Sequence, residues 1–140
     1  MATIRRMRPD ELDACAALYD RVVRATFAWF TDLGDQAAKF RHEADDEEVY
    51  VALTGERLVG LAAFYRPDNF LHSLYVEHEA HGQGIGSALM AHIELIADGP
   101  VSLKVQTRNT SARRFYEHKG FRVVEEGRDS DGAQWVRMSR

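Results

Sequence analysis

The stretch LYVEHEAHGQGIGSAL, residues 74–89, decides the fold class. It starts as a strand from Leu74 to Val76, passes into a loop in which three of the five residues from 82 to 86 are glycine, and continues as a helix from Ile85. Glycine permits backbone turns that aim successive N–H groups at one point, and the start of a helix adds unpaired N–H donors. The pattern therefore predicts an anion-binding turn between a strand and a helix.

Taken alone, the loop also fits an ordinary tight connection between a strand and a helix. A Walker loop is excluded because no Gly-Lys-Ser/Thr sequence follows the glycines. A dinucleotide-binding fingerprint fits poorly, since the loop lies in the middle of the chain, its glycine spacing differs and antiparallel strands are predicted before it. The ligand of the loop has to be decided from the rest of the chain.

Two periodicities alternate along the rest of the chain. Alternating apolar residues between turn sequences such as Thr54-Gly55-Glu56 predict strands, and apolar residues at helical spacing predict helices. The predicted order is a strand at 4–7, a helix opening at 9, a helix at 36–44, strands at 49–53, 58–65 and 70–76, a helix at 85–96, a strand at 101–105, a helix from 109 to 120, and strands at 121–125 and 134–138.

This order predicts an α/β fold of the mixed, α+β kind. The strand–helix–strand unit in the middle implies a right-handed crossover and a parallel pair, and the hairpins on either side are antiparallel. The chain has no linker, low-complexity tract or internal repeat, and 140 residues are enough for one core and too few to suggest two. We expect a single domain over residues 1–140.

Composition excludes several classes of protein. The net charge of −4 argues against broad, charge-driven binding of nucleic acid. No stretch approaches the roughly 18 apolar residues of a membrane helix, and the first residues lack the apolar run of a secretory signal, so we expect a cytoplasmic protein. The one cysteine, Cys15, can form no intrachain disulfide and no zinc cluster.

A second motif lies downstream of the glycine loop. In the segment NTSARRFYEHKGF, residues 109–121, helical spacing places Ala112, Phe115 and Tyr116 on one face. By itself this face also fits ordinary core packing of an aromatic pair. The two motifs together, in this order and setting, are much more specific than either alone.

The chain resembles the GNAT superfamily of N-acetyltransferases over nearly its whole length. The Arg/Gln-x-x-Gly-x-Gly/Ala loop of that family corresponds to residues 81–86, and its later coenzyme A motif to Asn109 with residues 112–121. His81 stands in place of the usual Arg or Gln, and His78 in place of a common proline. The resemblance implies a central, mostly antiparallel sheet of about seven strands, with a splayed parallel pair in its middle and about four helices packed on it.

The resemblance also implies acetyl-CoA as co-substrate. The pantetheine arm is expected along the backbone of the strand from Leu74 to Val76, with the pyrophosphate on the loop from Gly82 to Ser87. A backbone N–H of the strand would stabilise the developing oxyanion. The residues implied in cofactor binding are Leu74, Tyr75, Val76, His81, Gly82, Gln83, Gly84, Ile85, Gly86, Ser87, Asn109, Ala112, Phe115 and Tyr116.

Transfer of the acetyl group directly to a primary amine needs an acid and a base. The family motif implies Tyr116 as the general acid for the leaving thiolate. His72, two residues before Leu74, is the first candidate for the base because it titrates near neutrality, and a packing role for it is equally compatible with the sequence. Glu77 and Glu79 are weaker candidates, and Cys15 is expected to be a buried structural residue.

The acceptor is expected to be a small-molecule or peptide amine, with no nucleic acid, no membrane and a possible homodimer as further partners. Several aromatic residues favour an aromatic or apolar amine if they line the pocket: Phe27, Trp29, Phe30, Tyr65, Phe70 and Trp135. His78 and His81 have no convincing third ligand, so no metal site is predicted. The alternatives are a non-catalytic acetyl-CoA sensor and, less compatible with the acidic composition, an enzyme acting on aminoacyl-tRNA.

Overall fold

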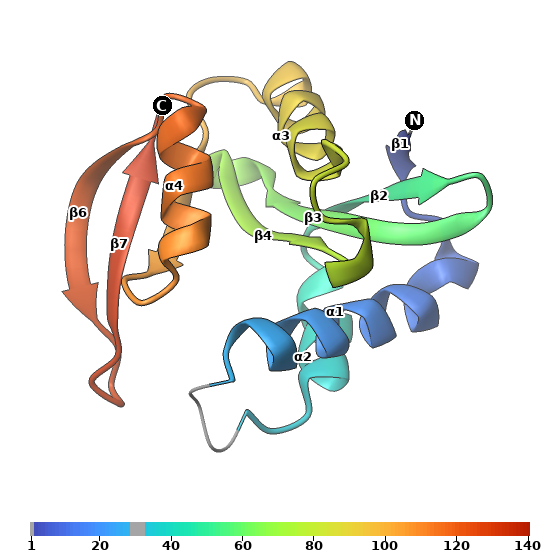
Figure 1. Ribbon diagram of the computed structural model, residues 1–140, viewed down its shortest axis with the longest axis horizontal. Helices are drawn as coiled ribbons and strands as arrows, with labels where there is room; N and C mark the ends of the chain where they lie inside the picture. Colours follow the sequence, from blue (N-terminus) through green and yellow to red (C-terminus); the bar gives the residue numbers. More distant parts are fainter. Residues whose placement is uncertain (1, 29–32) are drawn as a thin grey trace.

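The computed structural model describes residues 2–28 and 33–140, and shows a seven-stranded sheet with helices on both faces (Figure 1). Short 3₁₀ turns at Pro9–Glu11, Arg66–Asp68 and His78–Ala80 link some of the elements. The elements are β1 (Thr3–Arg6), α1 (Leu12–Thr26), α2 (Gln36–Ala44), β2 (Glu48–Thr54), β3 (Arg57–Tyr65), β4 (Phe70–Val76), α3 (Ile85–Ile96), β5 (Ser102–Gln106), α4 (Thr110–His118), β6 (Arg122–Arg128) and β7 (Gln134–Ser139).

The predicted elements and the predicted fold class are confirmed. The bounds of α2, β4 and α3 are those expected from the sequence. The largest differences are three residues: the helix expected to open at Pro9 starts with a 3₁₀ turn and α1 itself begins at Leu12, and β6, expected to end at Glu125, continues to Arg128. The last residues of β6 pair with β7, Gly127 with Trp135 and Arg128 with Gln134. Part of the polar stretch expected to be a loop therefore belongs to the β6–β7 hairpin.

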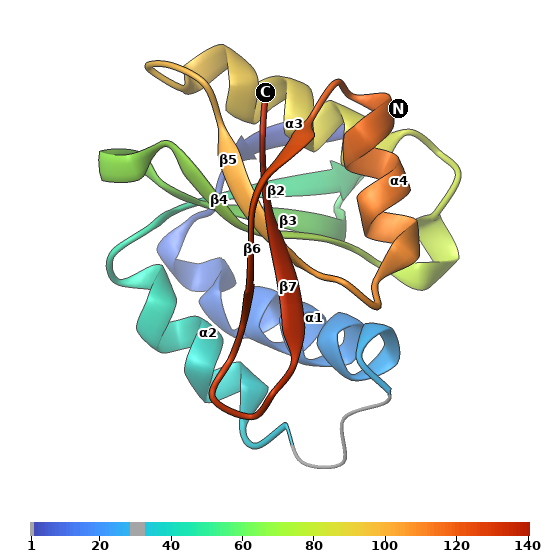
Figure 2. The ribbon, with the colours of Figure 1, turned by 90° about the vertical axis from the view of Figure 1, so that its left-hand side faces the viewer.

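The strand order is β1-β2-β3-β4-β5-β7-β6, and β4 and β5 are the parallel neighbours. Their pairing covers only Phe70 with Ser102 and Leu71 with Leu103. Both strands run on beyond these pairs, to Val76 and to Gln106. The sheet therefore opens between the carboxyl-terminal halves of β4 and β5, as predicted for a splayed pair. Figure 2 views the molecule from the side of the β6–β7 hairpin, which lies in front of β5 and β4.

Two apolar cores lie on the two faces of the sheet. The first gathers residues of α3 and α4, such as Leu89 and Tyr116, against the sheet. The second gathers residues of α1 and α2, such as Leu18 and Phe40, against the other face. Figure 1 shows α3 and the α1–α2 pair on opposite sides of β2, β3 and β4. Within the described residues, no helix is long and apolar enough to cross a lipid bilayer.

A β-bulge in β4 decides where its side chains point. Ala63 pairs with Ser73 and Phe64 with Leu71, so His72 has no opposite residue on β3. Side chains of a regular strand alternate between faces, which would place His72 on the same face as Leu74, in the core beneath α3. Because His72 is the extra residue of the bulge, its side chain instead points toward α2, where it contacts Glu43.

Candidate active site

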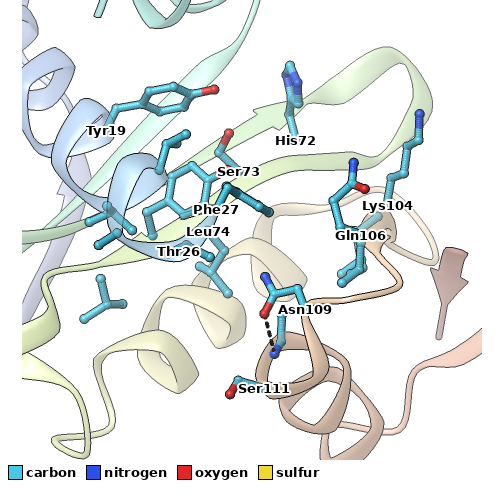
Figure 3. A pocket seen from close by; sticks show the side chains of 18 of the residues that line it. Tyr19, Thr26, Phe27, His72, Ser73, Leu74, Lys104, Gln106, Asn109 and Ser111 are labelled. Atoms are coloured by element: carbon cyan, nitrogen blue, oxygen red, sulfur yellow. Dashed lines mark hydrogen bonds between the residues drawn. The ribbon is translucent and has the colours of Figure 1, made fainter. Parts of the chain in front are cut away.

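A cleft of about 1270 Å³ lies where β4 and β5 separate. Its walls come from α1, α2, the whole of β4, the end of β5 and the start of α4. Figure 3 shows Tyr19 and Ser73 on one side of this space, with Gln106 and Asn109 on another. The volume exceeds the roughly 300–1,000 Å³ of common ligand pockets, so the cleft has room for a long ligand and a second reactant.

The glycine loop leads into α3 beside this cleft. Gly82 and Gly84 have φ of +82° and +77°, a conformation that favours glycine, and Gly84 is the residue that caps α3. No side chain of the described residues caps this helix start. The first intrahelical bond is donated by Ala88 N–H to Gly84 O at 3.0 Å, so the N–H groups of residues 85–87 have no intrahelical acceptor. These donors fit the oxygens of a pyrophosphate.

His81 bonds to the strand that forms one edge of the cleft. Its Nε2–H donates to the carbonyl oxygen of Val76 at 3.0 Å, since a carbonyl can only accept. The ring of His78 lies 5.3 Å from that of His81. His81 therefore lies at the cleft, with its ring bonded to the backbone of β4.

α4 contributes Asn109 and Tyr116 from two turns of one helix. Asn109 is the N-cap, and its Oδ1 accepts from Ala112 N–H at 3.3 Å (Figure 3). Tyr116 lines the cleft and is only 8% exposed. Burial raises the pKa of its phenol, which keeps the hydroxyl protonated at neutral pH. Phe115 lies beside Gly86, where an added Cβ would be 3.5 Å from the Phe115 ring.

His72 lies between two carboxylates at the α2 side of the cleft. Its Nδ1 is 2.7 Å from Glu47 Oε1, and its Nε2 is 3.5 Å from Glu43 Oε1. The hydrogen bond with Glu47 is the largest cause of a raised His72 pKa, and the charge of Glu43 adds to it. Burial raises the pKa of Glu43 itself. The imidazole is therefore more basic than a free histidine.

The other carboxylate candidates, Glu77, which also lines the cleft, and Glu79, are each held by an arginine. Glu77 accepts from Arg21 Nε at 3.0 Å, and Glu79 accepts from Arg57 at 3.0 Å. Cys15 is fully buried on α1, and burial raises its thiol pKa to about 12. A neutral, buried thiol is a poor nucleophile, so Cys15 is a core residue, as expected.

The structure gathers most of the predicted site around the cleft. Eight of the predicted residues line it: His72, Leu74, Tyr75, Val76, His81, Asn109, Ala112 and Tyr116. The remaining ones form the loop before α3, its first turn, or the packing against it: Gly82, Gln83, Gly84, Ile85, Gly86, Ser87 and Phe115.

The aromatic residues considered for the acceptor pocket divide differently. Phe27 and Phe70 line the cleft. Tyr65 does not line it, and Trp135 lines a separate cavity of about 330 Å³ near the β6–β7 hairpin. Trp29 and Phe30 lie outside the described residues. The cleft is also lined by Lys39, Lys104 and Arg137, so its described walls are less apolar than the aromatic residues suggested.

One group of described residues has the composition of a metal site. Glu43, Glu47 and His72 each bring a ligand atom within 4.8 Å of the others. Both imidazole nitrogens already face a carboxylate, Nδ1 at 2.7 Å and Nε2 at 3.5 Å. A cation would have to displace one of these contacts, so the arrangement is explained by hydrogen bonding and charge.

Sequence reasoning missed Glu43 and Glu47. Both lie in EADDEE, residues 43–48, a run of charge of the kind that is usually solvated. The side chain of Glu47 is only 6% exposed, and it meets His72 across 25 residues of sequence. The alternation that begins at Val49 fixes the strand and carries no information about a contact with β4.

Solved N-acetyltransferases share this fold. The solution structure of apo YjaB from Escherichia coli has a TM-score of 0.82 at 21% identity, covering 99% of this chain and 97% of that one. The PaiA N-acetyltransferase of Thermoplasma acidophilum, in complex with coenzyme A, has a TM-score of 0.80 at 18% identity, covering 98% of each chain. These likenesses show that the chain shares the fold of these proteins.

The chain belongs to the GNAT family: residues 14–140 match the family described as acetyltransferase (GNAT) domain. A curated relative, the peptidyl-lysine N-acetyltransferase YjaB of Salmonella typhimurium, is 30% identical over 138 residues, covering 89% of this chain and 86% of the relative. The resemblance inferred from the two motifs is confirmed, and the protein is a transferase of this family.

Proposed function

We propose that the protein transfers an acetyl group from acetyl-CoA directly to a primary amine of a small molecule or peptide. The observation that carries the proposal is the cleft between β4 and β5, which has the open start of α3 beside it and the protonated Tyr116 in its wall. These features supply an anion site, a slot between strand edges and an acid within one space. Coenzyme A has a pyrophosphate, an extended arm and a thiol in the corresponding order.

The proposed cofactor contacts follow from the donors available. The pyrophosphate would lie on the loop of Gly82 to Ser87, whose N–H groups need no side-chain charge. The pantetheine arm would pair with the backbone of Leu74 and Val76, which faces the opened part of the sheet. The amide of Asn109, which faces the cleft, would help to orient the arm. His81 would release the Val76 carbonyl or share it with the arm.

The acid and the base complete the reaction. An alkylamine with a pKa of about 10.4 is protonated at neutral pH, and removing that proton at pH 7.4 costs roughly 4 kcal/mol. His72 would take this proton, after which the amine nitrogen attacks the thioester carbonyl. A backbone N–H of β4 would stabilise the oxyanion. As the C–S bond breaks, Tyr116 gives its proton to the thiolate and regains one from the newly formed amide nitrogen through water.

A peptide lysine is the first acceptor to test, because the Salmonella relative is named a peptidyl-lysine N-acetyltransferase. A long, flexible alkylammonium group also fits a cleft whose inner end lies below the surface at Ser73, which is 5% exposed.

The test is release of coenzyme A thiol from acetyl-CoA with a panel of alkylamines and lysine peptides. Tyr116→Phe should lower kcat about 10²-fold or more while the affinity for coenzyme A stays within about 3-fold. Tyr65→Phe is the matched control, because Tyr65 does not line the cleft, and it should behave like the wild type. Tight binding of coenzyme A with no turnover on any acceptor would favour the non-catalytic sensor instead.

A further inference from the structure

The pair formed by Glu47 and His72 is more than a surface contact. Glu47 lies between α2 and β2, and its side chain is 6% exposed, whereas that of His72 is 37% exposed and reaches the cleft. The second oxygen of Glu47, Oε2, is buried and has no hydrogen-bond partner among the described residues. A buried carboxylate needs hydrogen-bond donors or opposite charge around it, and the hydrogen-bond partner of Glu47 Oε1 is the imidazole.

The bond also selects one form of the imidazole. A carboxylate oxygen accepts, so Nδ1 carries a proton and donates it to Glu47 Oε1 across 2.7 Å. In the neutral ring this leaves Nε2 with the lone pair. Nε2 is the nitrogen that faces Glu43, at 3.5 Å. A proton arriving at Nε2 therefore creates an imidazolium that has a carboxylate at each nitrogen.

Resting on the proposed function, we propose that Glu47 is a positioning residue for His72: it holds the ring as the Nδ1–H tautomer, so that Nε2, beside Glu43, takes the proton from a basic alkylammonium acceptor. The N–H bond of the ammonium breaks and an Nε2–H bond forms. The free amine is then the nucleophile, and the imidazolium returns its proton to solvent after the product leaves.

The charges around the ring favour this transfer. Glu43 and Glu47 stabilise the imidazolium, and Lys39 on α2 opposes it. Across the same cleft, β5 and β7 present Lys104 and Arg137, and each has its own carboxylate partner, Asp129 and Glu125 respectively. The ring of Phe70, with its centroid 6.2 Å from that of His72, packs beside the imidazole. The charged groups in direct contact with the His72 ring are the two carboxylates.

The proposal names a substrate class. A general base is useful when the acceptor arrives as an ammonium ion, and it adds little for an amine that is already neutral at the working pH. The acceptor should therefore be an alkylamine, such as a lysine side chain, and an arylamine should gain little from His72.

The decisive experiment is nitrogen-15 NMR of the six histidines, assigned to His72 with His72→Gln. In the wild type, the neutral ring should show a protonated Nδ1 and an unprotonated Nε2, and the ring should titrate above 6.5. Glu47→Gln should lower the midpoint by about one unit or more. The matched control is Asp46→Asn, which removes the same charge from the exposed neighbouring residue and should shift the midpoint far less.

This readout needs no turnover, so it stands apart from the test of the proposed function. A neutral His72 protonated at Nε2, or equal midpoints in Glu47→Gln and Asp46→Asn, would overturn the proposal. If Glu47→Gln does not fold, the tautomer in the wild type and the midpoint in Glu43→Gln still decide it.

The kinetic arm uses acetyl-CoA with the best lysine peptide of the panel. The acid limb of kcat/KM should move down with the NMR midpoint in Glu47→Gln, and the plateau should fall by roughly 10-fold or more. An acid limb that stays in place while the midpoint moves would remove His72 from the base role and overturn the catalytic part of the proposal.

Discussion

Replacing Gly84 by alanine separates the role of the loop in binding from its role in folding. Gly84 has φ of +77°, and a Cβ built there meets nothing within 4 Å, so the cost of alanine is conformational and not steric. The left-handed region costs an L-residue roughly 1–2 kcal/mol. The smaller conformational entropy of the unfolded chain with alanine in place of glycine offsets about 0.4–1 kcal/mol of that cost. Gly55 has φ of +63° and equally open space, in the turn between β2 and β3.

Both Gly84→Ala and Gly55→Ala should therefore lose stability by about 1 kcal/mol, measured by urea unfolding. Only Gly84→Ala should weaken the binding of coenzyme A. If alanine relaxes out of the left-handed region in the free protein, binding has to restore the strained loop, and 1–2 kcal/mol corresponds to about a 5- to 30-fold higher Kd. Isothermal titration with coenzyme A measures this directly. Wild-type affinity in a folded Gly84→Ala protein would refute the placement of the pyrophosphate on this loop.

Three further predictions concern single residues. Cys15→Ala should keep the wild-type kcat, and the native thiol should resist alkylation by iodoacetamide, because it is buried with a pKa of about 12. Asn109→Ala should lose about 1 kcal/mol of stability with the cap and also bind coenzyme A more weakly, whereas Asn109→Ser should recover the stability and not the binding, as read by urea unfolding and calorimetry. The hydrogen bond with Arg5 lowers the pKa of Glu11 from 4.5 to about 2. The stability that this carboxylate contributes is therefore fully present above pH 4.5 and is lost as the pH falls toward 2. Glu11→Gln should unfold with a smaller dependence on pH between 5 and about 3 than the wild type, by urea unfolding at each pH.

The fold could be predicted because its elements carry local signals. The strand from Phe70 to Val76 and the helix from Ile85 to Ile96 were placed with their observed bounds, since turn residues flank each and one periodicity fills each. The loop and the α4 motif were likewise visible, because glycine and an N-cap asparagine have conformational reasons to be where they are. The end of β6 could not be predicted, because its last residues are held in the strand by pairing with β7 and not by their own β propensity.

The position of His72, the candidate base, could not be predicted from the regular alternation of side chains along a strand. Leu71 and Leu74 pack into the same core although they are three residues apart, which a regular strand does not allow. The bulge explains this spacing, because it adds one residue, His72, between the two leucines. The side chain of His72 lies on the opposite face, where Glu43 and Glu47 lie. In a regular β4 the imidazole would lie among the apolar residues beneath α3, where burial opposes its charged form. The bulge thus turns a histidine that would have been a poor base into one supported by two carboxylates, and the spacing of the two leucines is the feature of the sequence that corresponds to it.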